Sequence, residues 1–175
     1  MRSYKSEKDI TIKVAKAEDL FDLKLCAKGF LEFIDDFQTK FLKNKIFILA
    51  AYYDNNLAGM LVSEQQTHKV DSIENLIPTI YLYLLYVNPK FRRRHIGTKL
   101  LESFLMLQKK KGIASICIKL PQKYKNGIKF FQHYEFQLVG LIKNNIILEH
   151  KIWDDYGISD CQLIGDDFNT TFRIN

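Results

Sequence analysis

Three consecutive arginines and a nearby glycine stand in one stretch of the sequence that could bind a negatively charged group. The segment NPKFRRRHIGTKLL, residues 88–101, contains Arg92, Arg93 and Arg94, followed by Gly97. Guanidinium groups match the geometry of phosphate, and a glycine lets a ligand approach the backbone closely. The segment is therefore a candidate phosphate seat. A solvated basic turn and a nucleic-acid contact are the alternatives.

The positive charge of the chain is concentrated around this segment. The 175 residues carry a formal net charge of +6, and the sequence pI is about 9.1. From Arg92 to Lys111 there are seven basic residues against the single acid Glu102. A polyanion such as nucleic acid and a small phosphorylated ligand both satisfy this charge, so charge alone does not decide between them.

The neighbouring residues predict a strand before the basic segment and a helix after it. Residues 79–87, TIYLYLLYV, form an aliphatic and aromatic run that is typical of a central strand covered on both faces. Apolar residues recur at helical spacing from Lys99 to Lys111, and Gly112 is placed to stop this helix. A helix start offers unpaired N–H groups and the positive end of the dipole, with Gly97 at the start and Thr98 available as a cap.

The rest of the chain predicts further strands and helices in a mixed order. Residues 9–15 alternate as a strand does, and residues 16–44 have helical spacing with a break near Gly29. The remaining predicted elements are a hairpin over 45–65 around Asp54–Asn56, a polar loop over 66–77, a strand over 114–120, a short helix over 126–134 and a hairpin over 136–153 around Asn144–Asn145. The predicted order is strand, helices, hairpin, strand, helix, strand, helix, hairpin.

The composition favours one folded domain without a membrane anchor or a metal. The chain is 47% apolar and 13% aromatic, enough to bury one substantial core, and we expect a single domain over residues 1–153. Residues 154–175 are polar and acidic, a C-terminal tail of unknown role. No apolar run approaches 18 residues and the N-terminus lacks a secretory signal, so we expect a cytoplasmic protein. The four histidines lack ligand spacing, so we expect no metal site.

Two blocks of the sequence resemble the GNAT superfamily of acyl-CoA-dependent N-acyltransferases. The first, LLYVNPKFRRRHIGTKLL, is similar to the family fingerprint of apolar-x-Val, x-Pro-x-aromatic and Arg-x-x-Gly-x-Gly, except that His95 replaces the first glycine. The second, GIKFFQHYEFQLVG over 127–140, resembles the family's helix with an aromatic pair and a closing Gly-Phe. The resemblance covers roughly residues 9–153. It implies the GNAT fold, an α/β (α+β) domain with a mixed sheet of about seven strands flanked by about four helices.

The resemblance also implies that acetyl-CoA binds at the end of the central strand and at the helix start. The strand backbone would pair with the pantetheine arm, and the amides of Ile96, Gly97 and Thr98 would hold the pyrophosphate with help from the arginines. His95 places a Cβ in this loop, which is tolerated if its backbone is near helical. The implied cofactor-binding residues are Leu85, Tyr86, Val87, Arg92, Arg93, Arg94, His95, Ile96, Gly97, Thr98, Gly127 and Phe131.

The catalytic acid of such an enzyme is not marked in this sequence. The helix tyrosine that usually protonates the leaving thiolate aligns with Phe131, which has no proton to donate. Tyr124 and Tyr134 lie near it and are candidates to replace it, although a structural role is the alternative for both. A free thiol ionises near pH 8.5, so its departure with help from water would also suffice.

The catalytic base is equally unmarked, because the central strand contains no carboxylate. Tyr83 has the strand parity of Leu85 and Val87 and could hold a water chain, with core packing as the alternative. Glu64 and His68, beside the predicted polar loop, could reach the acceptor from a neighbouring strand.

The resemblance therefore implies an N-acetyltransferase that would move an acetyl group from acetyl-CoA to a primary amine of a small molecule or peptide, by direct attack in a ternary complex. The nucleophile belongs to the acceptor, so no Ser/His/Asp set is required. One alternative is a GNAT-fold protein that binds acyl-CoA with weak catalysis. A basic nucleic-acid-binding domain is less favoured, because the basic helix needs its apolar face for a core. The acceptor and the oligomeric state, a homodimer included, stay open.

Overall fold

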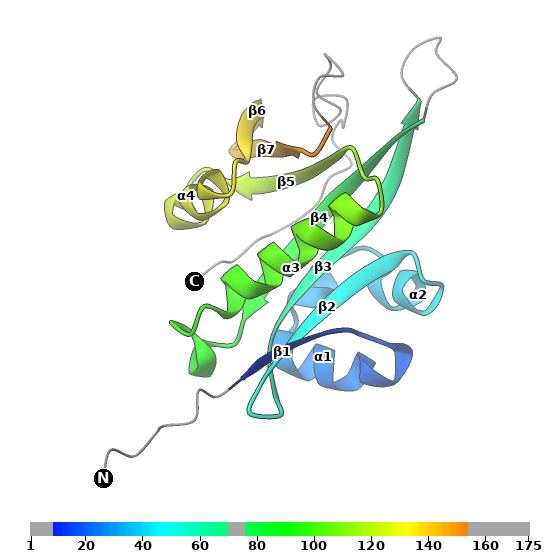
Figure 1. Cartoon of the computed structure of the whole chain (residues 1–175), viewed down its shortest axis with the longest axis vertical. Helices are drawn as coiled ribbons and strands as arrows, with labels where there is room; N and C mark the ends of the chain where they lie inside the picture. The colour runs from blue at the N-terminus through cyan, green and yellow to red at the C-terminus, as the bar shows by residue number, and fades with distance from the viewer. Residues whose placement is uncertain (1–8, 70–75, 154–175) are drawn as a thin grey trace.

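A seven-stranded sheet runs through the molecule and carries helices on both faces (Figure 1). The structure is a computed structural model, and it describes residues 9–69 and 76–153. The strands are β1 (Ile10–Val14), β2 (Ile46–Tyr53), β3 (Asn56–Lys69), β4 (Leu76–Val87), β5 (Ser115–Pro121), β6 (Gln137–Ile142) and β7 (Asn145–Lys151). The helices are α1 (Leu20–Ala27), α2 (Phe37–Leu42), α3 (Ile96–Lys110) and α4 (Lys125–His133), with 3-10 turns at Ala17–Asp19, Phe30–Phe33 and Pro89–Phe91.

The order of elements agrees with the sequence prediction, and three local assignments were wrong. The described parts of the predicted polar loop are strand, since β3 runs to Lys69, β4 begins at Leu76 and the two backbones pair there. Helix α3 begins at Ile96, three residues before the predicted start. Thr98 therefore lies inside the first turn, and His95 occupies the capping position. The predicted tail lies outside the described residues.

The two central strands β4 and β5 pair over only a short length. The strands follow the spatial order β1-β2-β3-β4-β5-β7-β6, and β4–β5 is the parallel pair among antiparallel ones. Their paired positions are Thr79–Ser115, Ile80–Ile116 and Tyr81–Cys117. Beyond Tyr81, β4 continues to Val87 on β3 alone, while β5 continues to Pro121 on β7. The sheet therefore parts between β4 and β5.

A β-bulge lies in β4 just beyond this parting. Val62 pairs with Leu84 and Ser63 with Leu82, so Tyr83 is the extra residue on β4. A bulge increases the local twist and redirects the side chains that follow it. The bulge thus changes which side chains of β4 share a face.

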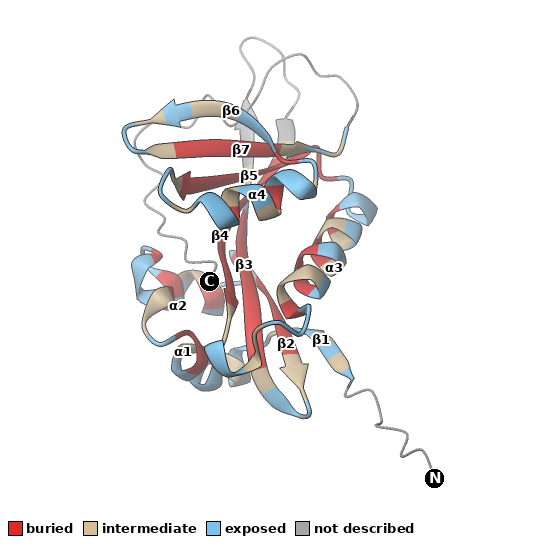
Figure 2. Cartoon of the chain, turned by 90° about the vertical axis from the view of Figure 1, so that its left-hand side faces the viewer, coloured by how far each residue is buried: buried red, intermediate tan, exposed pale blue. Residues whose placement is uncertain are grey.

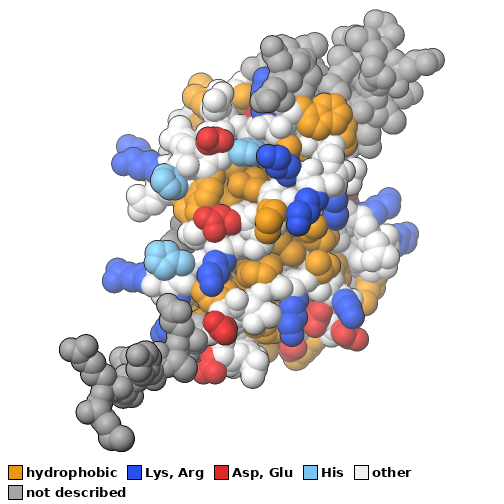
Figure 3. Space-filling view, viewed as in Figure 1, with side chains coloured by type: hydrophobic (Ala, Val, Ile, Leu, Met, Phe, Trp, Pro, Cys, Tyr) orange, Lys and Arg blue, Asp and Glu red, His pale blue; other side chains and the backbone are white. Residues whose placement is uncertain are grey.

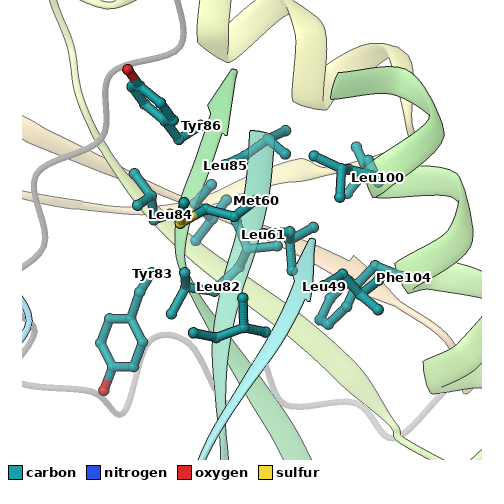
Figure 4. Close-up of a cluster of buried hydrophobic side chains, with 14 of the residues drawn as sticks. Leu49, Met60, Leu61, Leu82, Tyr83, Leu84, Leu85, Tyr86, Leu100 and Phe104 are labelled. Carbon is teal, nitrogen blue, oxygen red and sulfur yellow. The ribbon is translucent and has the colours of Figure 1, made fainter. Parts of the chain in front are cut away.

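The expectation that Tyr83 shares a face with Leu85 and Val87 was wrong, because a parity count assumes an unbroken pleat. Figure 4 shows the Tyr83 and Tyr86 rings on the side of the sheet away from α3, whereas Leu85 points toward Leu100 of α3. Tyr83 therefore faces the layer of α1 and α2.

Helix α3 is held on the sheet by its apolar face. Leu100, Leu101 and Phe104 are fully buried, and Leu105 packs against the same core. Figure 2 shows that buried residues recur along α3. Burying an aliphatic or aromatic side chain of this size stabilises a fold by about 1.5 to 3 kcal/mol. The spacing of these residues is the one that predicted the helix, and they place its N-terminus beside the end of β4.

Gly59 of β3 allows this placement because the chain comes too close there for a side chain. A Cβ at Gly59 would lie 2.6 Å from the carbonyl oxygen of Tyr86 and 3.3 Å from Cγ2 of Ile96. The first contact is with backbone in the middle of a sheet, which cannot move aside cheaply. Gly59 thus fixes the distance between β3, the end of β4 and the first residue of α3.

Replacing Gly59 by alanine is expected to destabilise the protein by about 2 to 3 kcal/mol, because it forces an overpacked contact onto backbone. Gly140→Ala is the matched control, since a Cβ there would meet Cδ1 of Ile147 at an ordinary 3.7 Å. The free energy of unfolding in urea measures both. Equal stability of the two variants would show that the contact at Gly59 relaxes freely.

Candidate active site

A cavity of about 200 Å³ lies where β4 ends and α3 begins. Its wall combines the end of the strand, the arginine loop, the first turn of the helix and one aromatic ring of α4. The lining residues are Leu85, Val87, Arg92, Arg93, His95, Ile96, Gly97, Thr98 and Phe130. All of them except Phe130 are among the cofactor-binding residues that the family resemblance implied.

The first turn of α3 presents its backbone amides at this cavity. The first intrahelical bond of the N-terminus is donated by Lys99 N–H to the carbonyl of His95, at 2.9 Å. A helix leaves the N–H groups before that bond without an intrahelical acceptor, here those of Ile96, Gly97 and Thr98. The His95 side chain makes no capping bond. These amides and the positive end of the helix dipole make the turn a seat for an anion.

The three arginines have different positions. Arg92 Nε donates to the carbonyl oxygen of Val87 at 3.2 Å, so this side chain holds the loop against the end of β4. Arg93 is exposed and lines the cavity. Arg94 turns toward β2, where its guanidinium lies 4.6 Å from the centre of the Tyr53 ring and Nη1 contacts the Tyr53 hydroxyl at 2.5 Å. Arg94 is therefore outside the lining.

Three other residues assigned to the cofactor also lie outside the lining. Tyr86 faces the opposite side of the sheet, with its ring 5.4 Å from that of Phe30. Gly127 is buried in α4, and Phe131 is fully buried with its ring 5.1 Å from that of Phe136.

The aromatic side chain that α4 contributes to the cavity is Phe130, which the sequence reasoning missed. Phe130 and Phe131 are adjacent on a helix and therefore point in different directions. Phe131 is fully buried, whereas Phe130 is partly buried against the same core and also lines the cavity. The sequence indicated an aromatic pair but not the helix phase.

The two tyrosines proposed as replacement acids flank α4. Tyr124 precedes the helix, and the Lys123 ammonium lies 5.3 Å from the centre of its ring. The Tyr134 hydroxyl contacts Oε1 of Glu102 at 3.3 Å, which links the end of α4 to α3. Neither lines the cavity, although the Tyr134 ring lies 5.3 Å from that of Phe130.

A second group of ionisable side chains lies on the other face of the sheet. The Tyr83 hydroxyl donates a hydrogen bond to Oε2 of Glu64 at 2.5 Å, and the Lys40 ammonium lies 3.0 Å from the same oxygen. Lys40 is also 5.8 Å from the centre of the Tyr83 ring. Gln66 makes a further hydrogen bond with Tyr83. We call Glu64, Tyr83 and Lys40 the carboxylate cluster.

Electrostatics keep the phenol of Tyr83 protonated. Burial, followed by the hydrogen bond to Glu64 and the negative charges of Glu64 and Asp35, raises the pKa of Tyr83 well above its usual value. At neutral pH this side chain therefore donates a proton to a hydrogen bond and does not act as a phenolate base. The group within the cluster that can accept a proton is the carboxylate of Glu64.

The cavity and the carboxylate cluster lie on opposite faces of the sheet, close to the point where β4 and β5 stop pairing. The last paired residue of β4 is Tyr81, the cluster includes Tyr83 two residues later, and the cavity is lined by Leu85 two residues after that. The cluster faces α2 and the cavity faces α3. The side chain of His68, the other candidate from this strand, lies outside what the structure describes.

The described residues hold no group of three or more His, Cys, Asp or Glu side chains that could bind a metal ion. Within the same residues, every helix is too short or too polar to cross a membrane. On the face that carries α3, the lysines and arginines are spread among apolar and acidic side chains (Figure 3).

Comparisons with known proteins give a family and a fold. A family model described as the acetyltransferase (GNAT) family matches residues 17–136. The PaiA N-acetyltransferase of Thermoplasma acidophilum, solved with coenzyme A, is 21% identical with a TM-score of 0.63, over 82% of this chain and 99% of that one. NAA60 of Arabidopsis thaliana, solved with acetyl-CoA, is 15% identical with a TM-score of 0.68, over 82% and 99%.

An N-acetyltransferase of Staphylococcus aureus Mu50 is 18% identical with a TM-score of 0.63, over 83% of this chain and 99% of that one. A search of curated proteins gives no match. Together, the family model and the solved structures confirm the fold that the sequence resemblance implied, a mixed sheet of seven strands with four helices.

His95 has a left-handed backbone, with φ 57° and ψ 21°, so the near-helical backbone that would tolerate a Cβ at this position is not present. Glycine adopts this conformation without steric cost, whereas a residue with a Cβ is strained by about 1 kcal/mol or more.

We expect His95→Gly to be about 1 kcal/mol more stable than His95→Ala. Thermal unfolding of the two variants measures the difference, and an alanine variant as stable as the glycine one would contradict the strained conformation.

Proposed function

The chain belongs to the GNAT family of acetyltransferases, and we propose that it transfers an acetyl group from acetyl-CoA to the primary amine of a small molecule or peptide, by direct attack in a ternary complex. The observation that carries this proposal is the cavity at the start of α3. There the free amides of a helix, two arginines and the end of a strand that has left its neighbour meet in one place.

The residues around the cavity fit the charged half of acetyl-CoA. The amides of Ile96, Gly97 and Thr98 would hold the pyrophosphate, and Arg92 and Arg93 add positive charge beside it. Gly97 leaves this approach open, since the nearest heavy atom that a Cβ there would meet is Cγ2 of Val87 at 3.6 Å. Donors, charge and space therefore agree with a pyrophosphate.

The backbone of β4 fits the pantetheine arm. Beyond Tyr81, the edge of β4 that faces β5 has no strand partner among the described residues. Backbone N–H and C=O groups require hydrogen-bond partners, and the amides of pantetheine can supply them. The thioester would then lie at the parting of the sheet.

The reaction needs a neutral amine and a leaving thiolate. The amine nitrogen attacks the thioester carbonyl, the C–S bond breaks, and the thiolate takes a proton. A thiol ionises near pH 8.5, so the CoA thiolate can leave without a dedicated acid. This agrees with the presence at position 131 of a buried phenylalanine, which has no acidic proton to donate. Tyr124 and Tyr134 stay predictions as acids. The boundary at residue 153, a cytoplasmic location and a homodimer also stay predictions from the sequence.

One observation favours the alternative of a weakly catalytic acyl-CoA-binding protein. The cavity lining contains Arg92, Arg93 and His95 but no carboxylate, so a base must come from elsewhere.

The nucleic-acid alternative lacks comparable support, because the apolar face of α3 is buried and the basic side chains are dispersed across that surface (Figure 3).

Release of CoA thiol from acetyl-CoA, measured with a panel of primary amines, tests the proposed reaction. We expect turnover with at least one alkylamine or lysine-containing peptide and none with secondary or tertiary amines of similar size. Binding of acetyl-CoA with no acetylated product from any amine would favour the acyl-CoA-binding alternative.

Binding of CoA is expected to depend on the backbone cradle more than on any one arginine. Gly97→Val should raise the Kd for CoA at least about tenfold, because the side chain covers the amides and their bonds to charged groups are worth about 1.5 to 3 kcal/mol each. Arg93→Ala should raise it by about threefold or less, as expected for an exposed charge. Isothermal titration calorimetry with CoA measures both. A larger loss for the arginine variant would show that the cradle assignment is wrong.

A further inference from the structure

We propose that Glu64 and Tyr83 form the seat for the ammonium group of the acceptor and that Lys40 fills this seat until the acceptor displaces it. This inference rests on the proposed acetyl transfer. It identifies the acceptor chemically as a primary alkylammonium and assigns the missing base to Glu64.

The contacts of Lys40 are those that an incoming ammonium would make. Its Nζ lies 3.0 Å from Oε2 of Glu64 and 5.8 Å from the centre of the Tyr83 ring. A carboxylate gives a charge-assisted hydrogen bond, and the face of an aromatic ring attracts a cation. The seat is therefore complementary to a primary ammonium on a flexible methylene chain.

Lys40 can leave this seat more easily than the other two members. The Lys40 side chain is 28% exposed, against 12% for Glu64, and it projects from α2, a helix of six residues. Tyr83 and Glu64 stand on the two longest strands of the sheet and are joined by their own hydrogen bond. A partly exposed lysine can exchange a single ion pair for water at little cost. When Lys40 leaves, the carboxylate stays in place without its cation.

The position of the seat suits a transfer between two substrates. The seat lies beside the bulge of β4 on the face of α2, and the cavity for acetyl-CoA lies on the face of α3. Between the seat and the cavity, the strands β4 and β5 are not paired with each other. An acceptor can thus approach the thioester from the face opposite the nucleotide, so that both substrates are bound at once.

Glu64 can also perform the proton transfer that the reaction requires. The ammonium gives one proton to the Glu64 carboxylate, and the free amine then attacks the thioester carbonyl. As the C–S bond breaks, the nitrogen loses a second proton, which passes through water to the departing CoA thiolate, and the amide keeps the third. Because the pKa of Tyr83 is raised, the phenol keeps its proton and acts as a positioning residue. Asp35 adds a second negative charge near Tyr83, which favours a cationic acceptor.

Steady-state kinetics of three variants test the seat, with acetyl-CoA saturating and with n-butylamine and 1,4-diaminobutane as acceptors. Lys40→Met should lower the KM for the amine about threefold to fivefold, because a competing cation is removed. Glu64→Gln keeps the shape of the side chain and should raise this KM and lower kcat/KM about a hundredfold or more. Lys43→Met removes an exposed lysine near α2 and should change neither. The Kd for CoA should be the same in all three.

A rise in amine KM in Lys40→Met would overturn the inference, since it would show that Lys40 is a fixed partner that holds Glu64 in place. An unchanged KM would overturn it as well. Calorimetric titration of 1,4-diaminobutane into the CoA complex gives a readout that needs no turnover, and binding should tighten in Lys40→Met and weaken in Glu64→Gln. Diamine binding with this pattern but no acetylation would count against the proposed function and leave the ammonium seat supported.

Discussion

The parting of β4 from β5 after three backbone pairs is the constraint on which the rest of the candidate site depends. A sheet normally satisfies its backbone N–H and C=O groups by continuous pairing, and this one stops pairing in its middle. Each strand continues on its other neighbour, so the fold keeps its stability while one edge of β4 stays available to a ligand. The bulge at Tyr83 lies just past this point and turns that side chain to the face opposite the cavity.

Gly59 and His95 position the N-terminal amides of α3 beside the gap between β4 and β5. A Cβ at Gly59 would lie only 2.6 Å from the Tyr86 carbonyl oxygen, so the glycine allows β3 to approach the end of β4 and sets the start of α3 against it. His95 turns the chain into the helix through a left-handed conformation that costs some stability. The arginines contribute less than their number suggests, because Arg92 braces the loop and Arg94 packs on Tyr53.

Charged groups that can bind substrates of opposite sign lie on the two faces of the sheet near the parting. The α3 face offers helix amides and arginines, and the α2 face offers Glu64 with Asp35 nearby. An anionic cosubstrate and a cationic acceptor are each drawn to one face and repelled from the other. In the proposed reaction this arrangement orders both substrates without any covalent nucleophile on the protein. In the resting protein Lys40 pairs with Glu64 on the acceptor side, and an incoming ammonium group would replace it there.

The order of elements and the amphipathic face of α3 could be predicted from the periodicity of the sequence, because these depend on residues close together in the chain. Most of the cavity lining was implied by the resemblance of one continuous segment to the GNAT superfamily. The sequence did not determine which face Tyr83 occupies, which of Phe130 and Phe131 lines the cavity, or how far β3 extends. The carboxylate cluster joins residues 19 and 24 positions apart from Glu64, on three different elements. Only strand register, a bulge and helix packing bring such residues together, and these follow from long-range pairing that no local pattern records.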